Sequence, residues 1–95
     1  YKIMALKIIE NKGSFFIDGK ITCHNEQAMT LHFEYILRNR NHLTINISDV
    51  TEIDSGGLVA MTTMYKHALQ TNKLFTIIGK GSREIYAHFK NQNIA

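Results

Sequence analysis

The middle of the chain contains the segment Leu43–Leu58, which reads LTINISDVTEIDSGGL. Apolar and polar residues alternate strictly over 43–47, and this period of two is typical of a β-strand with one buried face. A loop through Asp49, Thr51 and Asp54 is expected next, followed by a helix from about Gly57 to Gln70. The segment therefore predicts a strand, a short loop and a helix in succession, which is the building unit of an α/β fold.

The flanking sequence extends this alternation. β-branched and apolar residues predict strands over 3–9 and from Phe15 to Thr22, joined by a turn at 11–14. Helical periodicity begins at His24 or Asn25 and stops at 38–41. A strand over 74–78 and a short helix capped by Ser82 complete the order β-β-α-β-α-β-α. We expect a single α/β domain over 1–95, with a mixed sheet of about four strands and about three helices packed mostly on one face.

Helical and strand periodicity also predict which side chains form the core. In the second helix the inward stripe is expected at Leu58, Met61, Thr62, Tyr65 and Leu69. Met64 lies off that stripe, so it is either an exposed partner contact or a residue of ordinary flank packing. The predicted core comprises Ile17, Met29, Phe33, Ile45, Ile47, Leu58, Met61, Tyr65, Ile77 and Phe89.

Composition excludes several classes of protein. The chain has 95 residues, a net charge of +3 and basic residues that are scattered rather than clustered, which argues against direct binding of nucleic acid. No apolar stretch approaches the ~20 residues of a membrane-spanning helix. The single cysteine and five unpaired histidines predict neither a disulfide nor a metal site, and nothing implies a cofactor. We expect a cytoplasmic protein.

Ser55 is the residue with the clearest potential for chemical modification. A helix start carries unpaired N–H groups and a partial positive charge, so a phosphoryl group on Ser55 would be accommodated there. The alternative is that Ser55 or Asp54 simply caps the helix. A serine-hydrolase elbow requires glycine two residues before the serine, where this chain has Ile53. We therefore do not expect an enzyme.

The segment 43–58 resembles the signature of STAS domains, the family of bacterial anti-sigma factor antagonists and of related domains in sulfate transporters. The resemblance extends to 18–21, to the first helix and to the strand 74–79. It implies that Ser55 is phosphorylated by an anti-sigma factor that is also a serine kinase of the histidine-kinase-like ATPase type, and dephosphorylated by a PP2C-type phosphatase. Asp54, Gly56, Gly57 and Leu58 would then lie on the partner-binding surface, with Met64 as a further candidate.

The resemblance leaves two functions open. One is an anti-sigma factor antagonist that binds the kinase only when unphosphorylated and thereby regulates sigma-factor-dependent transcription. The other is an accessory subunit of a lipid-trafficking ABC transporter, where the acceptor position is commonly threonine, so Ser55 favours the first. Two positions depart from the family pattern: Gly56 stands where a second Ser, Ala or Thr is frequent, and Glu52 stands where an aromatic or aliphatic residue is common.

Overall fold

The computed structural model describes residues 1–92 and has the predicted α/β architecture. Its elements are β1 (Lys2–Ile3), β2 (Leu6–Asn11), β3 (Ser14–Ile21), α1 (Glu26–Asn39), β4 (His42–Ile53), α2 (Ser55–Gln70), β5 (Leu74–Ile78) and α3 (Ser82–Asn91). Residues 93–95 of the predicted domain lie outside this description. The sheet has five strands rather than four, because a turn at Met4 and Ala5 divides the segment predicted as one strand. Ala5 adopts a φ of 61° there, in the left-handed region.

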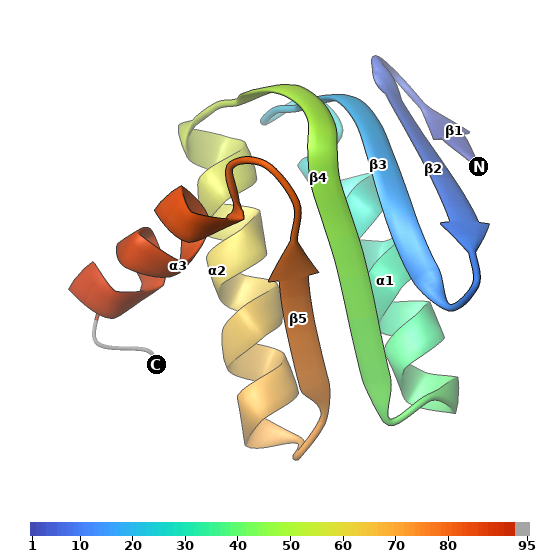
Figure 1. Cartoon of the computed structure of the whole chain (residues 1–95), viewed down its shortest axis with the longest axis vertical. Helices are drawn as coiled ribbons and strands as arrows, with labels where there is room; N and C mark the ends of the chain where they lie inside the picture. The colour runs from blue at the N-terminus through green and yellow to red at the C-terminus, as the bar shows by residue number, and fades with distance from the viewer. Residues whose placement is uncertain (93–95) are drawn as a thin grey trace.

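The five strands lie side by side in chain order, from β1 to β5. β2 is antiparallel to both of its neighbours, β1 and β3, whereas β3, β4 and β5 run parallel, so the sheet is mixed. The predicted turn between β2 and β3 is confirmed: Lys12 and Gly13 have φ angles of 53° and 84°, the conformation of a tight hairpin turn. Figure 1 shows α1 and α2 together behind the sheet, while α3 lies beside the edge strand β5.

β4 is much longer than the sequence pattern predicts. The expected loop through Asp49 and Thr51 is wrong: the strand continues to Ile53, and α2 begins at Ser55 rather than near Gly57. The alternation of buried and exposed residues along β4 stops at Ser48. From there on β3 shifts register twice against β4, between Phe16 and Asp18 and between Gly19 and Lys20. Pairing with β3 therefore stabilises a stretch of strand in which the period of two is interrupted.

The core lies between the sheet and the helices. Eight of the ten predicted core residues are buried, and Leu58 and Tyr65 are half-buried against the same cluster. The predicted stripe of α2 is rotated relative to the structure: Leu69 is 51% exposed, whereas Met64 is 2% exposed. The small residues Ala60 and Ala68 face the core, so the helix lies close to its neighbours. Because Met64 is buried, it is a packing residue, and its prediction as an exposed partner contact is wrong.

α3 covers part of the edge strand β5. Its residues Ile85 and Phe89 are buried, and Phe89 stacks on Tyr65 of α2 with ring centroids 4.6 Å apart. The hydroxyl of Tyr86 accepts a hydrogen bond from the backbone N–H of Ile77 at 2.8 Å. Gly81, rather than Ser82, occupies the cap position, with a φ of 95°. Within 1–92, no helix is long and apolar enough to cross a membrane.

Candidate functional site

Ser55 is the first residue of α2 and lies directly beyond the end of β4. Its side chain is exposed, and among the described residues its hydroxyl has no hydrogen-bond partner. We call residues 54–57 the acceptor turn. The turn is fixed to the sheet because the N–H of Asp54 donates to the carbonyl oxygen of Ile21, at the end of β3, over 3.1 Å. The end of β3 thus determines where α2 begins.

The helix cap is Asp54, not Ser55. One carboxylate oxygen of Asp54 accepts from the backbone N–H of Gly57 at 2.8 Å, and the other accepts from the N–H of Cys23 at 3.0 Å. These N–H groups stabilise the ionised carboxylate, so they hold the pKa of Asp54 below its ordinary value. Because Asp54 meets the capping requirement, the hydroxyl of Ser55 is left free for chemistry.

The two glycines of the acceptor turn are required by close packing. A Cβ atom added at Gly57 would lie 2.4 Å from the carbonyl oxygen of Ile21. A Cβ atom added at Gly56 would lie 2.8 Å from the Cβ of Cys23. Neither distance is compatible with a side chain unless something moves, so α2 begins in direct contact with the end of β3 and with the loop that follows it.

That loop, residues 22–25, connects β3 to α1 and is fixed by Asn25. Asn25 is 2% exposed, and its side-chain amide nitrogen donates to the carbonyl oxygens of Met4 and Lys20, at 2.6 and 2.8 Å. Its side-chain oxygen accepts from the N–H of Thr22 at 2.9 Å. Asn25 occupies the cap position of α1 without capping it, because its amide group is used to hold the loop. Cys23 is exposed on this loop.

The structure places the predicted partner-binding residues at different depths. Asp54, Gly56 and Leu58 are half-buried around the exposed Ser55, whereas Gly57 is buried under the end of β3. Sequence reasoning missed Val59, which is 63% exposed. Helical spacing carried the signal, since residues i and i+4 share a face and Val59 is four residues after Ser55.

Sequence reasoning also missed that Cys23 touches this turn. Cys23 is 33 positions before Gly56 in the chain, and no local pattern links the two residues. The contact arises because β3 and β4 are parallel neighbours, so the residues that follow each strand meet at the same end of the sheet. Cys23 and Gly56 meet because of the strand order, which cannot be read from the local sequence.

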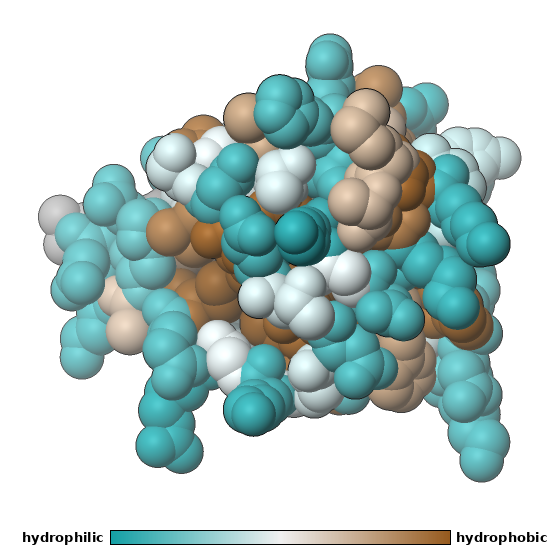
Figure 2. Space-filling view, turned by 90° about the horizontal axis from the view of Figure 1, so that it is seen from above, coloured by the Kyte–Doolittle hydropathy of each residue, from teal (hydrophilic) through white to brown (hydrophobic). Residues whose placement is uncertain are grey.

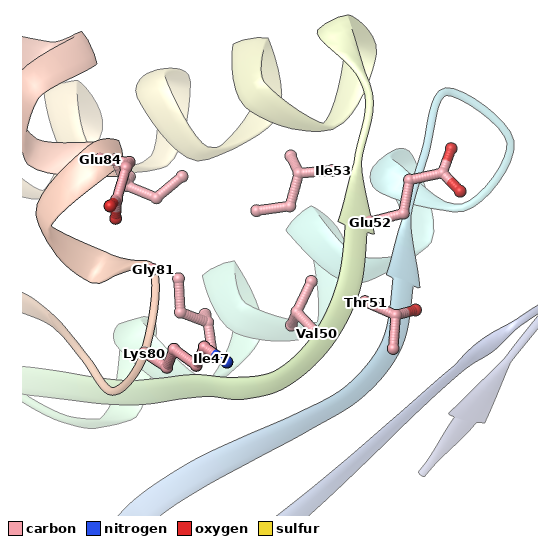
Figure 3. A pocket seen from close by; sticks show the side chains of 9 residues that line it. Ile47, Val50, Thr51, Glu52, Ile53, Lys80, Gly81 and Glu84 are labelled. Atoms are coloured by element: carbon pink, nitrogen blue, oxygen red, sulfur yellow. The ribbon is translucent and has the colours of Figure 1, made fainter.

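A groove of about 340 Å³ lies beside the end of β4, on the side of α3. Figure 3 shows Val50 and Ile53 pointing into it from β4 and Glu84 at its α3 side, whereas Glu52 points away. The Glu52 carboxylate lies 3.8 Å from the Lys20 ammonium group, an exposed ion pair of little energetic weight. Figure 2 looks onto this end of the molecule and shows apolar atoms in a hollow between polar groups. The groove therefore has an apolar floor and ends at Ile53, two residues before Ser55 in the chain.

Acidic and metal-binding groups do not converge near the turn. Within the described residues, no group of three or more His, Cys, Asp or Glu side chains is arranged to hold a metal ion. The other prominent ion pair, Arg40 with Glu10 at 2.8 Å, joins residues from the end of α1 and from β2. Its guanidinium group lowers the pKa of Glu10. Among the described residues at the turn, the hydroxyl of Ser55 and the thiol of Cys23 are the exposed nucleophilic groups.

Solved structures with the same fold include three at low sequence identity. An anti-sigma factor antagonist from Mycobacterium paratuberculosis has a TM-score of 0.65 and 17% identity, covering 93% of this chain and 78% of that one. An uncharacterized DUF3478-family protein with a SpoIIAA-like fold, from Shewanella loihica PV-4, has a TM-score of 0.57 and 20% identity, covering 94% and 77%. Mglu has a TM-score of 0.60 and 12% identity, covering 78% of this chain but 19% of Mglu. These likenesses show the fold.

A search of curated protein sequences finds no match. The sequence does match a family model, that of the STAS domain, over residues 4–91. The match includes every helix and strand from β2 to α3, and it contains the acceptor turn. The chain therefore belongs to the STAS domain family.

Proposed function

We propose that the protein is a cytoplasmic, non-catalytic partner switch: an anti-sigma factor antagonist that binds an anti-sigma factor when Ser55 is unphosphorylated. The anti-sigma factor is also the serine kinase, of the histidine-kinase-like ATPase type, and a PP2C-type phosphatase reverses the modification. The observation that carries this proposal is the division of roles at the acceptor turn. Asp54 caps α2 with both carboxylate oxygens engaged, while the hydroxyl of Ser55 is exposed and free.

The proposed modification is a phosphoryl transfer from ATP bound to the kinase. The oxygen of Ser55 forms a bond to the γ-phosphorus, the bond from that phosphorus to the β,γ-bridging oxygen breaks, and ADP leaves. The hydroxyl proton passes to a base of the kinase. In the reverse reaction, water displaces the serine oxygen and releases inorganic phosphate, which restores the hydroxyl.

Phosphorylation is expected to weaken partner binding more than it weakens folding. It adds about −1.5 to −2 charges beside the ionised Asp54, on a surface that the partner would otherwise cover. In the free protein the phosphate remains in water at a helix start, where the helix dipole favours a negative charge. In the complex it is desolvated and lies near the nucleotide phosphates of the kinase, so the complex loses stability.

The proposal is tested with paired baits, Ser55→Ala and Ser55→Asp, in affinity capture followed by a kinase assay. We expect the Ala form to retain a histidine-kinase-like ATPase that the Asp form loses, and that ATPase to phosphorylate the wild-type chain but not Ser55→Ala. Ser82→Ala and Ser82→Asp are matched controls, because Ser82 is also the first residue of a helix. Equal retention of permease and ATPase subunits of a transporter by both Ser55 baits would contradict the proposal and favour the accessory-subunit function.

A further inference from the structure

The contact between Cys23 and Gly56 joins the loop 22–25 to the acceptor turn. A Cβ at Gly56 would lie 2.8 Å from the Cβ of Cys23, 3.0 Å from its Cα and 3.3 Å from its backbone nitrogen. The same nitrogen donates to Asp54 at 3.0 Å. Cys23 therefore touches the residues on both sides of Ser55, one through a hydrogen bond and the other through van der Waals contact.

The loop side of this contact is held in place and cannot readily move away. Asn25 anchors the loop through three hydrogen bonds to Met4, Lys20 and Thr22, and it is buried. The turn side has no side chains at Gly56 and Gly57, so its position depends on the contacts that its backbone makes with Ile21 and with Cys23. The anchored loop thus holds the helix start from one side, and the end of β3 holds it from the other.

We propose that Cys23 is the positioning residue for phosphoryl transfer to Ser55. Its Cβ and backbone confine the acceptor turn to one conformation and exclude a side chain at position 56, so the turn presents a single hydroxyl in one orientation. The inference rests on the proposed phosphorylation of Ser55. Cys23 acts here through its Cβ and backbone, and its thiol has no part in the reaction.

The physical reason is the geometric demand of group transfer. The attacking oxygen must lie about 3–3.5 Å from the phosphorus and in line with the leaving group, and a misplacement of ~1 Å can reduce the rate by about 100-fold. Gly56 and Gly57 have no side chains that could hold the turn, so the orientation of the Ser55 hydroxyl depends on these backbone contacts. The contact at Cys23 fixes that orientation before the kinase binds.

The test uses four variants with the kinase that phosphorylates Ser55 in the assay above. Cys23→Gly removes the Cβ, and we expect kcat to fall by about 10- to 100-fold while KM changes little. Cys23→Ser keeps the Cβ and replaces only the sulfur, so it serves as the matched control and should retain wild-type kcat. Gly56→Ser introduces the clash and should reduce kcat by a similar factor. In the double variant Cys23→Gly/Gly56→Ser the two effects should compensate, with a coupling of about fivefold or more.

A kinase-free measurement accompanies the kinetics. In ¹H–¹⁵N spectra, Cys23→Gly should shift or broaden the amide signals of residues 54–57, and Cys23→Ser should leave them nearly unchanged. If Cys23→Gly does not fold, Gly56→Ser and Cys23→Ser still decide the matter, since the first must lose activity and the second must keep it.

The outcomes separate this inference from the proposed function. If wild-type protein is phosphorylated at Ser55 but Cys23→Gly or Gly56→Ser has wild-type kcat, the positioning role is wrong and the switch stands. A loss of activity in Cys23→Ser equal to that in Cys23→Gly would also overturn it, because the thiol would then be essential. If no kinase modifies Ser55, the proposed function fails and the inference fails with it.

Discussion

Replacing Gly57 by alanine tests whether α2 begins in rigid contact with the sheet. The added Cβ would lie 2.4 Å from the carbonyl oxygen of Ile21, about 0.9 Å short of the distance of about 3.3 Å at which such atoms normally meet. It would also lie 2.9 Å from the Ile21 carbonyl carbon and from its Cγ2. The carbonyl belongs to the backbone of β3, which pairs with β4 as far as Ile21 and Ile53, so the helix is expected to move rather than the strand.

The free-energy change can be estimated from three contributions. Overpacking of this kind costs about 1–3 kcal/mol. Movement of the helix start weakens the hydrogen bond from the N–H of Asp54 to Ile21, worth about 1 kcal/mol. Alanine has a higher helix propensity than glycine, which offsets the destabilisation by up to about 1 kcal/mol. We therefore expect Gly57→Ala to lower the free energy of unfolding by about 2 kcal/mol, and Tm by about 8–16 °C for a domain of this size.

Urea and thermal unfolding of purified wild type and variant would measure this change. Val59→Ala is the matched control, because Val59 lies in the same part of α2 with an exposed side chain and should change stability by less than about 0.5 kcal/mol. The reasoning is refuted if Gly57→Ala is as stable as wild type or more stable. In that case helix propensity would outweigh the contact, and the closeness of α2 to β3 would not be a fixed feature.

Two further predictions concern hydrogen bonds that the structure shows. Tyr86→Phe leaves the N–H of Ile77 without a partner, so we expect a loss of about 1–3 kcal/mol in urea unfolding and faster amide exchange at Ile77; unchanged exchange there would contradict the assigned bond. The pKa of Asp54 is lowered on folding, so its stabilising effect is present above the ordinary carboxyl pKa of 3.8 and is lost as the pH falls through the folded value. Thermal unfolding between pH 6 and pH 2 should therefore show a shallower acid decline for Asp54→Asn than for wild type, and parallel profiles would argue against the cap.

Local patterns in the sequence were sufficient to predict the fold class and most of the elements. The hairpin turn at Lys12 and Gly13, the limits of α1 and the position of β5 all depend on neighbouring residues, and all three are confirmed. The turn at Ala5 was missed because alanine rarely adopts a positive φ, so its residue type gave no signal.

Features that depend on distant contacts could not be predicted from the sequence. β4 reaches Ile53 because β3 pairs with it through two register shifts, although alternation ends at Ser48. The stripe of α2 was assigned by helical spacing from Leu58, which included Leu69 and omitted Ala60 and Ala68, yet these small residues face the core. Within the site, Ser55 and Asp54 were identified as candidates, and the cap bond from Gly57 to Asp54 is local, whereas the second bond, from Cys23, depends on the strand order.

The order of the strands in the sheet has a consequence for synthesis of the chain on the ribosome. Every strand pairs with the one before it in sequence, so the partner of each new strand has already been synthesised when that strand emerges. The sheet can therefore grow from β1 toward β5 without rearrangement. The exposed growing edge passes from strand to strand during translation. It is closed only when α3 emerges and Tyr86 binds the N–H of Ile77. Residues 54–57 are positioned two elements earlier, when α2 docks against the end of β3, so a nascent chain can present Ser55 before β5 and α3 have left the tunnel.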